Sequence, residues 1–463
     1  MRRLAALSLL VLGACAARET PERRRPLFAS SEPVIAVVAS APPAPVISGA
    51  VPIDLPSVLA LAGEKPNTIR LAREKLALAD ALEDTSLAGL LPSLVVGGRF
   101  QRHNGTIQDV GGAFIETTKQ DTFLGGTGEV VLDASGVFAY LRERQRHEAA
   151  SADLEAATNE GAGRAAAAYF ELQGAEAEVE IARDGLVHAQ AFEAIAASRE
   201  RNKVGIALDT LRAQAEVARA RQDVILSEER ARVASIRLAT LLRLDATVTL
   251  HAADDRVRPV TFVAPETPVA KLVETALAAH PDIHAAERRV QAADLEDDAA
   301  RLGPFVPLVR AGVGGLGGGL GYDGTNLGAL RDREDYYMAV ELHLDGLGLG
   351  EVARARAAGA RLRAERVRAD DVKDEVIRLV LEAREAVRAR SAAIQVARDE
   401  LDAATEARSI AEKRLEQGTG IALDVIAAED ERTRAASRLV QAITGYDAAQ
   451  YALLVRLGEP PPR

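Results

Sequence analysis

Few residues of this 463-residue chain have the types and spacing that catalysis or metal binding requires. His280 and His284 are four residues apart, which suits a metal pair, but at a helix start such a pair more often lies in solvent. The glycine run that begins at Gly315 superficially resembles a phosphate loop, yet it lacks the GK[ST] ending and the helix after it. The sequence has no Ser/His/Asp grouping and no CxxC or HExxH motif. We therefore expect no enzyme, no catalytic residue, no metal and no cofactor.

The only cysteine, Cys15, follows a segment typical of an export signal. Two arginines precede an apolar run from Leu4 to Leu12, which is too short for a membrane-spanning helix of about 20 residues. The last residues of this segment and the cysteine, LGAC, resemble the bacterial lipobox, whose cysteine becomes the lipidated first residue of the mature chain. We predict a signal peptide over 1–14 and a covalent lipid, such as palmitate, on Cys15. A plain signal peptide with an incidental cysteine is the alternative. A lone thiol excludes an internal disulfide.

Composition favours long helices over a large compact core. Aromatic residues make up 3% of the chain and tryptophan is absent, whereas aromatics supply much of the buried area in globular interiors. The net charge is −11, with both signs interspersed, which argues against a nucleic-acid partner. After Cys15, a stretch rich in Pro, Ala and Val continues to residue 56 and is typical of an extended tether. No later segment reads as a transmembrane helix.

Matching segments at one fixed spacing predict that the chain contains the same unit twice. The pentapeptide GIALD occurs at 205–209 and again, 215 residues later, at 420–424. Three matches at one offset favour a duplicated unit of about 200 residues. We predict a first repeat over 57–258, a second over 259–458, and a tail over 459–463. Two proline motifs show the same offset: Pro66 with Pro281, and Pro92 with Pro307.

Each repeat contains two segments with the period of a β-strand. The clearest is 335–345, where apolar and polar residues alternate strictly. Polar, Gly-rich loops are expected between the paired strands, about 103–121 and 317–334. A soluble sheet with one packed face is the alternative for such alternation, but no other segment looks suited to cover it. The other expected strands are 94–101, 124–133 and the Gly-rich 307–315. The predicted lipid-facing residues of the clearest strand are Tyr336, Met338, Val340, Leu342 and Leu344.

Helical patterns surround each strand pair. One helical stretch precedes each pair, over Pro56–Ala88 and Pro268–Leu302. A very long helix follows each pair, about 137–202 and 349–417, and the second carries a narrow apolar stripe typical of a coiled-coil seam. A returning helix of about 35 residues completes each half. The order helix, strand, strand, long helix, turn, helix predicts two long antiparallel hairpins with GIALD at their tips.

The GIALD residues have a structural and a functional interpretation. Gly205, Gly418 and Gly420 are expected to end the long helices, because glycine adopts the left-handed conformation at low cost. Asp209 and Asp424 are expected to cap the returning helices. The functional interpretation is compatible with this one and depends on the family resemblance given below: these five residues would belong to a docking site and a pore entrance, where a ring of six carboxylates, two from each of three chains, would favour cations.

These features together resemble the TolC-like outer-membrane efflux protein family, in particular its lipid-anchored members. The resemblance covers about 54–458. It rests on the lipobox at Cys15, the helix starts KPNTI and HPDI, the strand prolines Pro92 and Pro307, the strand ends VVLDASG and LHLDGLG, and the GIALD tips. The two-repeat layout is the most specific of these items, and the lipobox is the least.

The resemblance implies an α+β membrane protein that works as a homotrimer. Each protomer would contribute four strands to a shared transmembrane β-barrel and its helices to a coiled-coil barrel in the periplasm. The tips would dock onto a periplasmic adaptor that leads to an inner-membrane pump. Asp424 matches an acidic tip position of the family. The chain departs from the family where some members carry an acid, a base and a tyrosine, at Ala427, Gly420 and Leu415.

The predicted function is therefore a passive export duct. It would lie in the outer membrane of a Gram-negative cell, anchored by lipid, as the outer component of a tripartite efflux or secretion system. The alternative is a structural periplasmic coiled-coil lipoprotein without channel activity. The alternating strands favour the duct, because a scaffold has no use for a lipid-facing strand. The exported substrate cannot be read from the sequence.

Overall fold

The chain divides into two units, residues 1–46 and residues 47–463. The fold described below is that of the second unit. The predicted signal segment, Cys15 and Gly315 lie outside the described residues, as does the predicted tether up to residue 49. The last part of that tether was predicted wrongly, because residues 50–53 form a strand and a helix begins at Leu55. The computed structural model describes residues 50–109, 111–245, 247–254, 257–314, 318–323, 326–332, 334–342 and 344–459.

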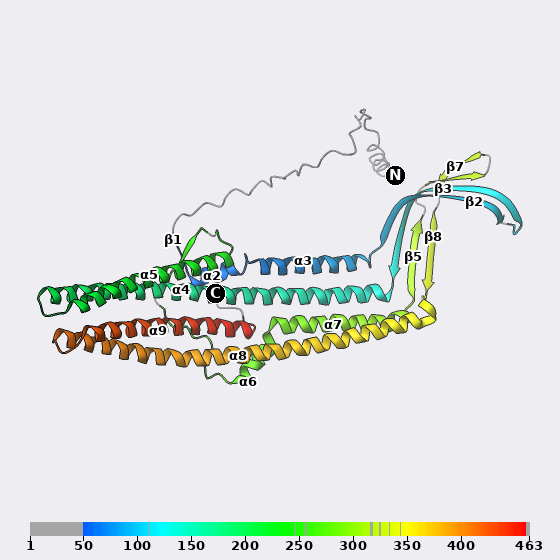
Figure 1. Ribbon diagram of the computed structural model, residues 1–463. Helices are drawn as coiled ribbons and strands as arrows, with labels where there is room; N and C mark the ends of the chain where they lie inside the picture. The colour runs from blue at the N-terminus through cyan, green and yellow to red at the C-terminus, as the bar shows by residue number, and fades with distance from the viewer. Residues whose placement is uncertain are drawn as a thin grey trace, which may run out of the picture. The chain divides into compact units, whose positions relative to one another are not determined.

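Two long helical hairpins dominate the fold, as predicted (Figure 1). Their helices begin and end within three residues of the expected positions. No helix in the described part of the chain is long and apolar enough to cross a membrane. The first hairpin consists of α4 (Ala134–Arg201) and α5 (Ala207–Leu241), and the second of α8 (Leu349–Glu416) and α9 (Ala422–Arg456).

Each helical stretch before the strands is broken in two. Pro66 and Pro281 mark the breaks, because a proline disfavours helical geometry in the residue before it but suits the first turn of a new helix. His280 is the N-cap of the second of these helices and its Nδ1 accepts a hydrogen bond from the Asp282 N–H at 3.2 Å. It is buried, so the expected solvent position was wrong for His280, whereas His284 is exposed. The four helices are α2 (Leu55–Ala62), α3 (Asn67–Ala88), α6 (Val269–Ala279) and α7 (Pro281–Leu302).

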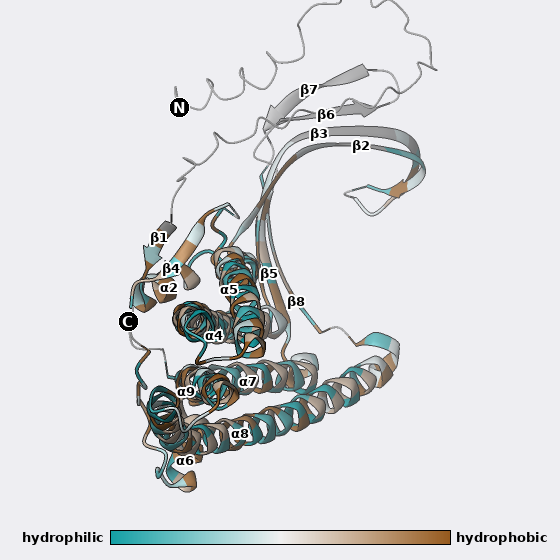
Figure 2. Cartoon of the chain, turned by 60° about the vertical axis from the view of Figure 1, so that its left-hand side comes forward, coloured by the Kyte–Doolittle hydropathy of each residue, from teal (hydrophilic) through white to brown (hydrophobic). Residues whose placement is uncertain are grey.

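Narrow apolar seams hold the hairpins together. Val376, Val380 and Val387 of α8 pack with Ile443 and Leu453 of α9. Their spacings of four, seven and ten residues place them on one side of each helix, as in a coiled coil. Hydrophobic and hydrophilic residues consequently run side by side along the long helices (Figure 2). Larger side chains gather where the two halves of the chain meet, around Tyr169, Phe170, Phe262 and Tyr451.

One antiparallel sheet adjoins the ends of the helices. Its order is β7-β6-β3-β5-β8, and β2 pairs with β3. The two predicted loops are largely wrong, because β2 and β3 extend through all but five residues of the first and β6 and β7 form a hairpin within the second. Backbone pairing satisfies strand N–H and C=O groups whatever the side chains, so polar and glycine residues did not end these strands. The strands are β2 (Ser93–Gln108), β3 (Phe114–Leu132), β5 (Leu308–Gly314), β6 (Gly318–Asp323), β7 (Asn326–Asp332) and β8 (Asp335–Glu341).

A second, two-stranded sheet was not predicted. The strands β1 (Ala50–Ile53) and β4 (Thr249–Ala252) pair in parallel. Each has only four residues, which is too short for an alternation pattern to be visible in the sequence. This pair packs on the apolar cluster at the middle of α4.

Candidate functional site: an exposed sheet face and two hairpin tips

The strand register builds one continuous apolar face across β2, β3, β5 and β8. Residues directly opposite each other in an antiparallel pair point to the same side of the sheet. Leu94 and Val96 of β2 lie on this side, opposite Gly128 and Gly126 of β3. The rows across β8, β5 and β3 are Val340, Val309 and Leu132, then Met338, Ala311 and Val130, then Tyr336, Val313 and Gly128.

This apolar face is open to its surroundings. Tyr336 is 75% exposed, Met338 76% and Val340 62%. Contiguous exposed apolar surface of this kind marks an interaction or membrane site. Leu342 and Leu344 are also exposed, but the strand predicted to include them ends at Glu341. The ladder stops there because its partner strand β5 begins at Leu308, opposite Glu341. A short 3-10 segment, Asp345–Gly348, follows.

The opposite face of the same strands is polar. The Tyr337 hydroxyl donates a hydrogen bond to Glu129 Oε2 at 2.5 Å, and Arg310 Nη1 lies 3.5 Å from Glu129 Oε1. Gly312 lies between the two bonded residues in the register. An added Cβ there would stand 2.5 Å from the Tyr337 oxygen and 2.8 Å from the Gly128 carbonyl oxygen. The glycine therefore permits a polar contact that spans three strands.

The two hairpin tips have the same backbone hydrogen bonds. At the end of α4, the Val204 and Gly205 N–H groups donate to the Arg199 carbonyl at 2.9 and 3.0 Å. At the end of α8, the Thr419 and Gly420 N–H groups both donate to the Arg414 carbonyl at 2.9 Å. This is the Schellman arrangement, in which a left-handed residue turns the chain away from the helix.

The glycines at the tips serve two different purposes. Gly418 has a φ of 76° and is left-handed as predicted, but its counterpart in the first tip is Lys203, with a φ of 62°. Gly205 and Gly420 are not left-handed, so that prediction was wrong for them. They are needed for close approach, since a Cβ on Gly205 would stand 3.0 Å from Arg199 Cβ, and one on Gly420 would stand 2.9 Å from the Leu415 nitrogen.

The two aspartates do not cap the returning helices. The N-caps are Ile206 and Ile421, and neither makes a side-chain capping bond. Asp209 and Asp424 are instead the third residues of α5 and α9, where an acid in the first turn still suits the helix dipole. Asp209 Oδ1 also lies 3.8 Å from Arg212 Nη1.

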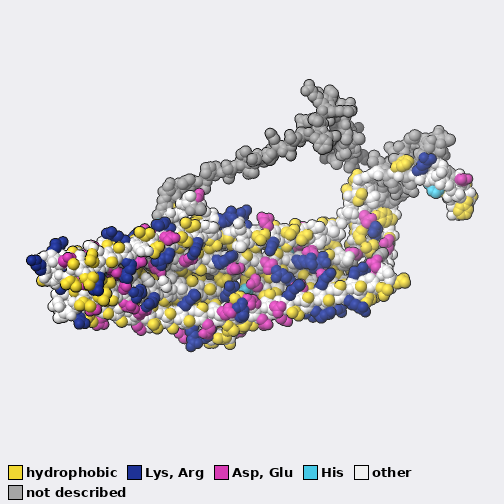
Figure 3. Space-filling view, in the orientation of Figure 1, with side chains coloured by type: hydrophobic (Ala, Val, Ile, Leu, Met, Phe, Trp, Pro, Cys, Tyr) yellow, Lys and Arg dark blue, Asp and Glu magenta, His cyan; other side chains and the backbone are white. Residues whose placement is uncertain are grey.

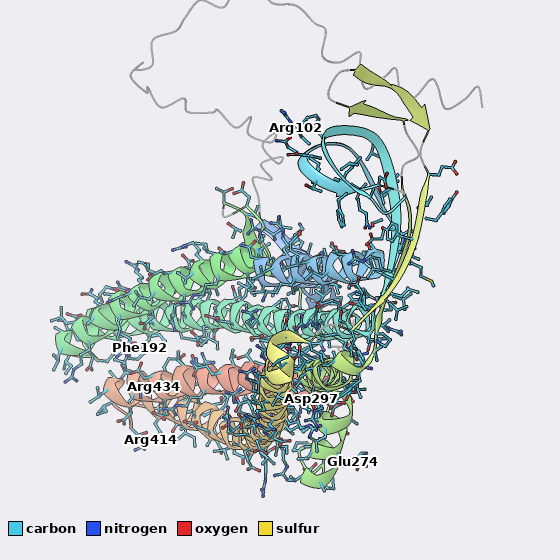
Figure 4. The ribbon with its side chains drawn as sticks, turned by 90° about the vertical axis from the view of Figure 1, so that its right-hand side faces the viewer. Arg102, Phe192, Glu274, Asp297, Arg414 and Arg434 are labelled. Atoms are coloured by element: carbon cyan, nitrogen blue, oxygen red, sulfur yellow. The ribbon has the colours of Figure 1, made fainter. Side chains whose placement is uncertain are left out.

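The structure brings both tips to one end of the helices. Phe192 of α4 packs in one apolar cluster with Ala422 and Val425 of α9, and Figure 4 shows Phe192 and Arg414 at this end. Arg199 Nη1 donates to the Leu415 carbonyl of the other hairpin at 2.9 Å. The first tip also exposes a set of apolar side chains, part of the hydrophobic surface seen at this end in Figure 3: Val204, Ile206, Leu208 and Leu211.

An ion-pair network links the hairpins farther from the tips, and sequence analysis missed it. Arg408 of α8 bonds Glu429 of α9 at 2.6 Å and His188 of α4 at 2.9 Å. Arg432 of α9 reaches Asp184 of α4 at 2.6 Å. His188 and Asp184 of α4 lie more than 200 residues along the chain from the arginines they contact, so no local pattern could have indicated these contacts between the hairpins. Among the described residues, no group of three or more metal-ligating side chains is arranged to hold a metal.

Two long hairpins thus continue into a sheet with one apolar and one polar face. Residues 59–242 match the family model described as "Outer membrane efflux protein". The predicted resemblance to TolC-like outer-membrane efflux proteins is thereby confirmed, by the family model over the first half and by the fold over most of the chain. No curated protein sequence matches the chain.

Solved structures of outer-membrane channels share this fold. The OprN channel is 23% identical, with a TM-score of 0.73 over 87% of this chain and 89% of its own. VceC from Vibrio cholerae is 19% identical, with a TM-score of 0.71 over 88% and 96%. The open state of MtrE from Neisseria gonorrhoeae is 21% identical, with a TM-score of 0.68 over 88% and 89%. At these identities the likeness establishes the fold.

Proposed function

We propose that this protein is the outer-membrane channel of a tripartite efflux or secretion system, through which substrates leave the cell passively. The observation that carries the proposal is the two-faced sheet. Exposed Tyr336, Met338 and Val340 stand on one side, and Glu129 and Arg310 on the other. Hydrocarbon outside and water inside a pore require this division. A purely structural scaffold would have no reason to leave such an apolar face uncovered.

The proposed channel is a homotrimer. Among the described residues, β8 pairs only with β5 and β2 pairs only with β3. Each of these two strands therefore has one unpaired edge. Unpaired strand edges cannot persist in lipid, and strands from further copies would satisfy them by closing a shared β-barrel. The helices would continue the barrel as a coiled-coil tunnel in the periplasm, while a lipid on Cys15 would add an anchor.

The hairpin tips are the proposed docking site for a periplasmic adaptor, which connects the channel to an inner-membrane pump. Exposed apolar residues of the first tip offer a contact surface, and Gly205, Gly418 and Gly420 set the backbone that presents it. Asp209 and Asp424 would form the ring of acids at the entrance. Replacing both by asparagine is then expected to reduce cation selectivity; unchanged conductance and selectivity would leave them as helix-start residues only.

A pair of neighbouring substitutions tests the two-faced sheet. Met338→Arg places a charge on the apolar face, at a cost of about 2–4 kcal/mol if this face meets the middle of the bilayer. Ala339→Arg, its matched control, places the same charge on the polar face one residue away. We expect Met338→Arg to abolish heat-modifiable trimers in isolated outer membranes, while Ala339→Arg leaves their yield within about twofold. Equal yields from the two variants would contradict the assignment of the faces.

A further inference from the structure

Three of the four helices of the first half recur in the second half with the same length. Both α3 and α7 have 22 residues, and α4 and α8 have 68. Each helix of the second half begins within one residue of an offset of 215 from its counterpart. A position in one half therefore has a defined counterpart in the other, and the surroundings of the two can be compared residue by residue.

The counterparts differ in what covers them. Within the chain, α7 packs between α4 and α8, whereas α3 packs on α4. Ala286 and Ala293 of α7 are 6% and 8% exposed, but their counterparts on α3, Leu71 and Leu78, are 58% and 60% exposed. Leucines at positions that are buried in the equivalent helix indicate that α3 lacks a neighbour. On α8, Val367 is likewise 60% exposed.

Within the chain, the two halves are joined by the packing of α7 on α4. The equivalent packing, of α3 on α8, is the contact that these two helices lack. Where α7 packs on α4, Arg289 Nη2 donates to Asp153 Oδ1 at 2.7 Å. The counterpart of Asp153 is Arg368 on α8, and the counterpart of Arg289 is Glu74 on α3. The two counterparts again carry opposite charges, with acid and base exchanged. They cannot meet within one chain, because α3 and α8 are the outermost of the four adjacent helices α3, α4, α7 and α8.

Both side chains are available for a partner. Glu74 is exposed and makes no ion pair with the described residues of its own chain. The side chain of Arg368 is 69% exposed, and its one ion pair with the residues that the structure describes is with Glu365, a turn earlier on the same helix. The neighbouring Arg73 donates to the Gly63 carbonyl at 3.1 Å, so its charge is directed along its own chain.

We propose that a second copy of this chain packs its α3 on the exposed flank of α8, in the register that α7 adopts on α4, with Glu74 of one copy facing Arg368 of the next. Leu71 of one copy then meets Val367 of the other. Such an interface joins two different surfaces and closes into a ring when the rotation permits. The inference rests on the proposed trimer and specifies which surfaces form it.

The exchanged charges would also select the right neighbour. If α3 of another copy took the place of α7 on α4, Glu74 would face Asp153. If α7 of another copy took the place of α3 on α8, Arg289 would face Arg368. For this pair, both wrong arrangements bring like charges together and both right arrangements bring opposite charges together, which favours the right junctions. The second bridge from α7 to α4, between Arg288 and Glu148, has Arg73 and Arg363 as its counterparts and does not add to this selection.

Charge reversal and its rescue test the interface. The variants are Arg368→Glu, Glu74→Arg and the double variant, each purified as the full chain in detergent and assayed for trimer dissociation by sedimentation. We expect each single variant to raise the dissociation constant about fivefold per interface. The double variant should return within about twofold of the wild type. The control is Asp370→Arg, a reversal at a position that is exposed in both halves, as its counterpart Glu155 shows; it should have no effect.

The outcomes separate this inference from the proposed function. Single variants that behave like Asp370→Arg, a double variant no better than the singles, or a wild type that is monomeric would overturn the proposed interface. A wild-type trimer that dissociates as expected but carries no current would leave the interface standing and would count against the channel instead. Recovery of the trimer in the double variant also shows that the single variants fail in assembly and not in folding.

Discussion

Lys203 carries a conformational cost that its counterpart avoids. It holds the left-handed position at the end of α4 with a φ of 62°, while Gly418 holds the same position after α8 with a φ of 76°. A side chain with a Cβ pays about 1 kcal/mol more than glycine in this conformation. Lys203→Gly should therefore stabilise the first tip by about 1 kcal/mol, and Gly418→Lys should destabilise the second tip by a similar amount.

Amide hydrogen exchange at the tips measures this effect directly. The Val204 N–H donates to the Arg199 carbonyl at 2.9 Å and is released only when the turn opens. A change of about 1 kcal/mol alters the opening equilibrium about fivefold. We therefore expect Val204 to exchange about five times more slowly in Lys203→Gly. The control Lys203→Ala keeps a Cβ and should leave the rate unchanged. Equal rates in the glycine and alanine variants would refute the reasoning from backbone conformation.

Three further predictions concern the sheet, the helical body and the tips. Gly312→Val should prevent trimer formation, because even a Cβ would stand 2.8 Å from the Gly128 carbonyl oxygen, whereas Gly97→Val, where nothing lies within 4 Å, should be tolerated; trimer yield checks both. Burial raises the pKa of Asp447 to about 7. As pH rises from 4 to 7 the unfolded chain loses this proton while the folded chain keeps it, so the free energy of unfolding falls by roughly 2–4 kcal/mol. Asp447→Asn should therefore make the melting temperature less dependent on pH over that range. Phe192→Ala removes a buried ring and should lower local stability by about 3–5 kcal/mol. We expect faster amide hydrogen exchange that is confined to the tips, and an equal increase along the whole helical body would contradict this prediction.

The periodic elements were predictable because their patterns are long. The hairpin helices and the strand around Met338 repeat their period often enough for the sequence to indicate them. The proline breaks at Pro66 and Pro281 were visible as helix starts, but a continuous helical pattern around them obscured the interruption. Extension of β2 to Gln108 was not predictable, because its pairing with β3 stabilises polar residues that carry no strand signal of their own.

The finer geometry of the candidate site depends on contacts between distant residues. The close approach that requires Gly205, and the packing that requires Gly312, are set by neighbours that the sequence alone does not locate. Asp209 matched the residue type of a cap, but its position in the first turn is one that only the structure reveals. Asp153 and its counterpart Arg368 carry opposite charges, and this difference gained a meaning only once the structure showed that Asp153 pairs with Arg289 between α4 and α7.

Single-channel recording tests the central claim most directly. The purified wild-type protein, added to a planar lipid bilayer, should insert as a trimer and produce discrete, long-lived current steps. Ala339→Arg, which places a charge on the polar face, should shift the ion selectivity of those steps towards anions. A trimer that inserts stably in the bilayer but gives no current, in the wild type or in any tip variant, would contradict the account of this protein as an export channel.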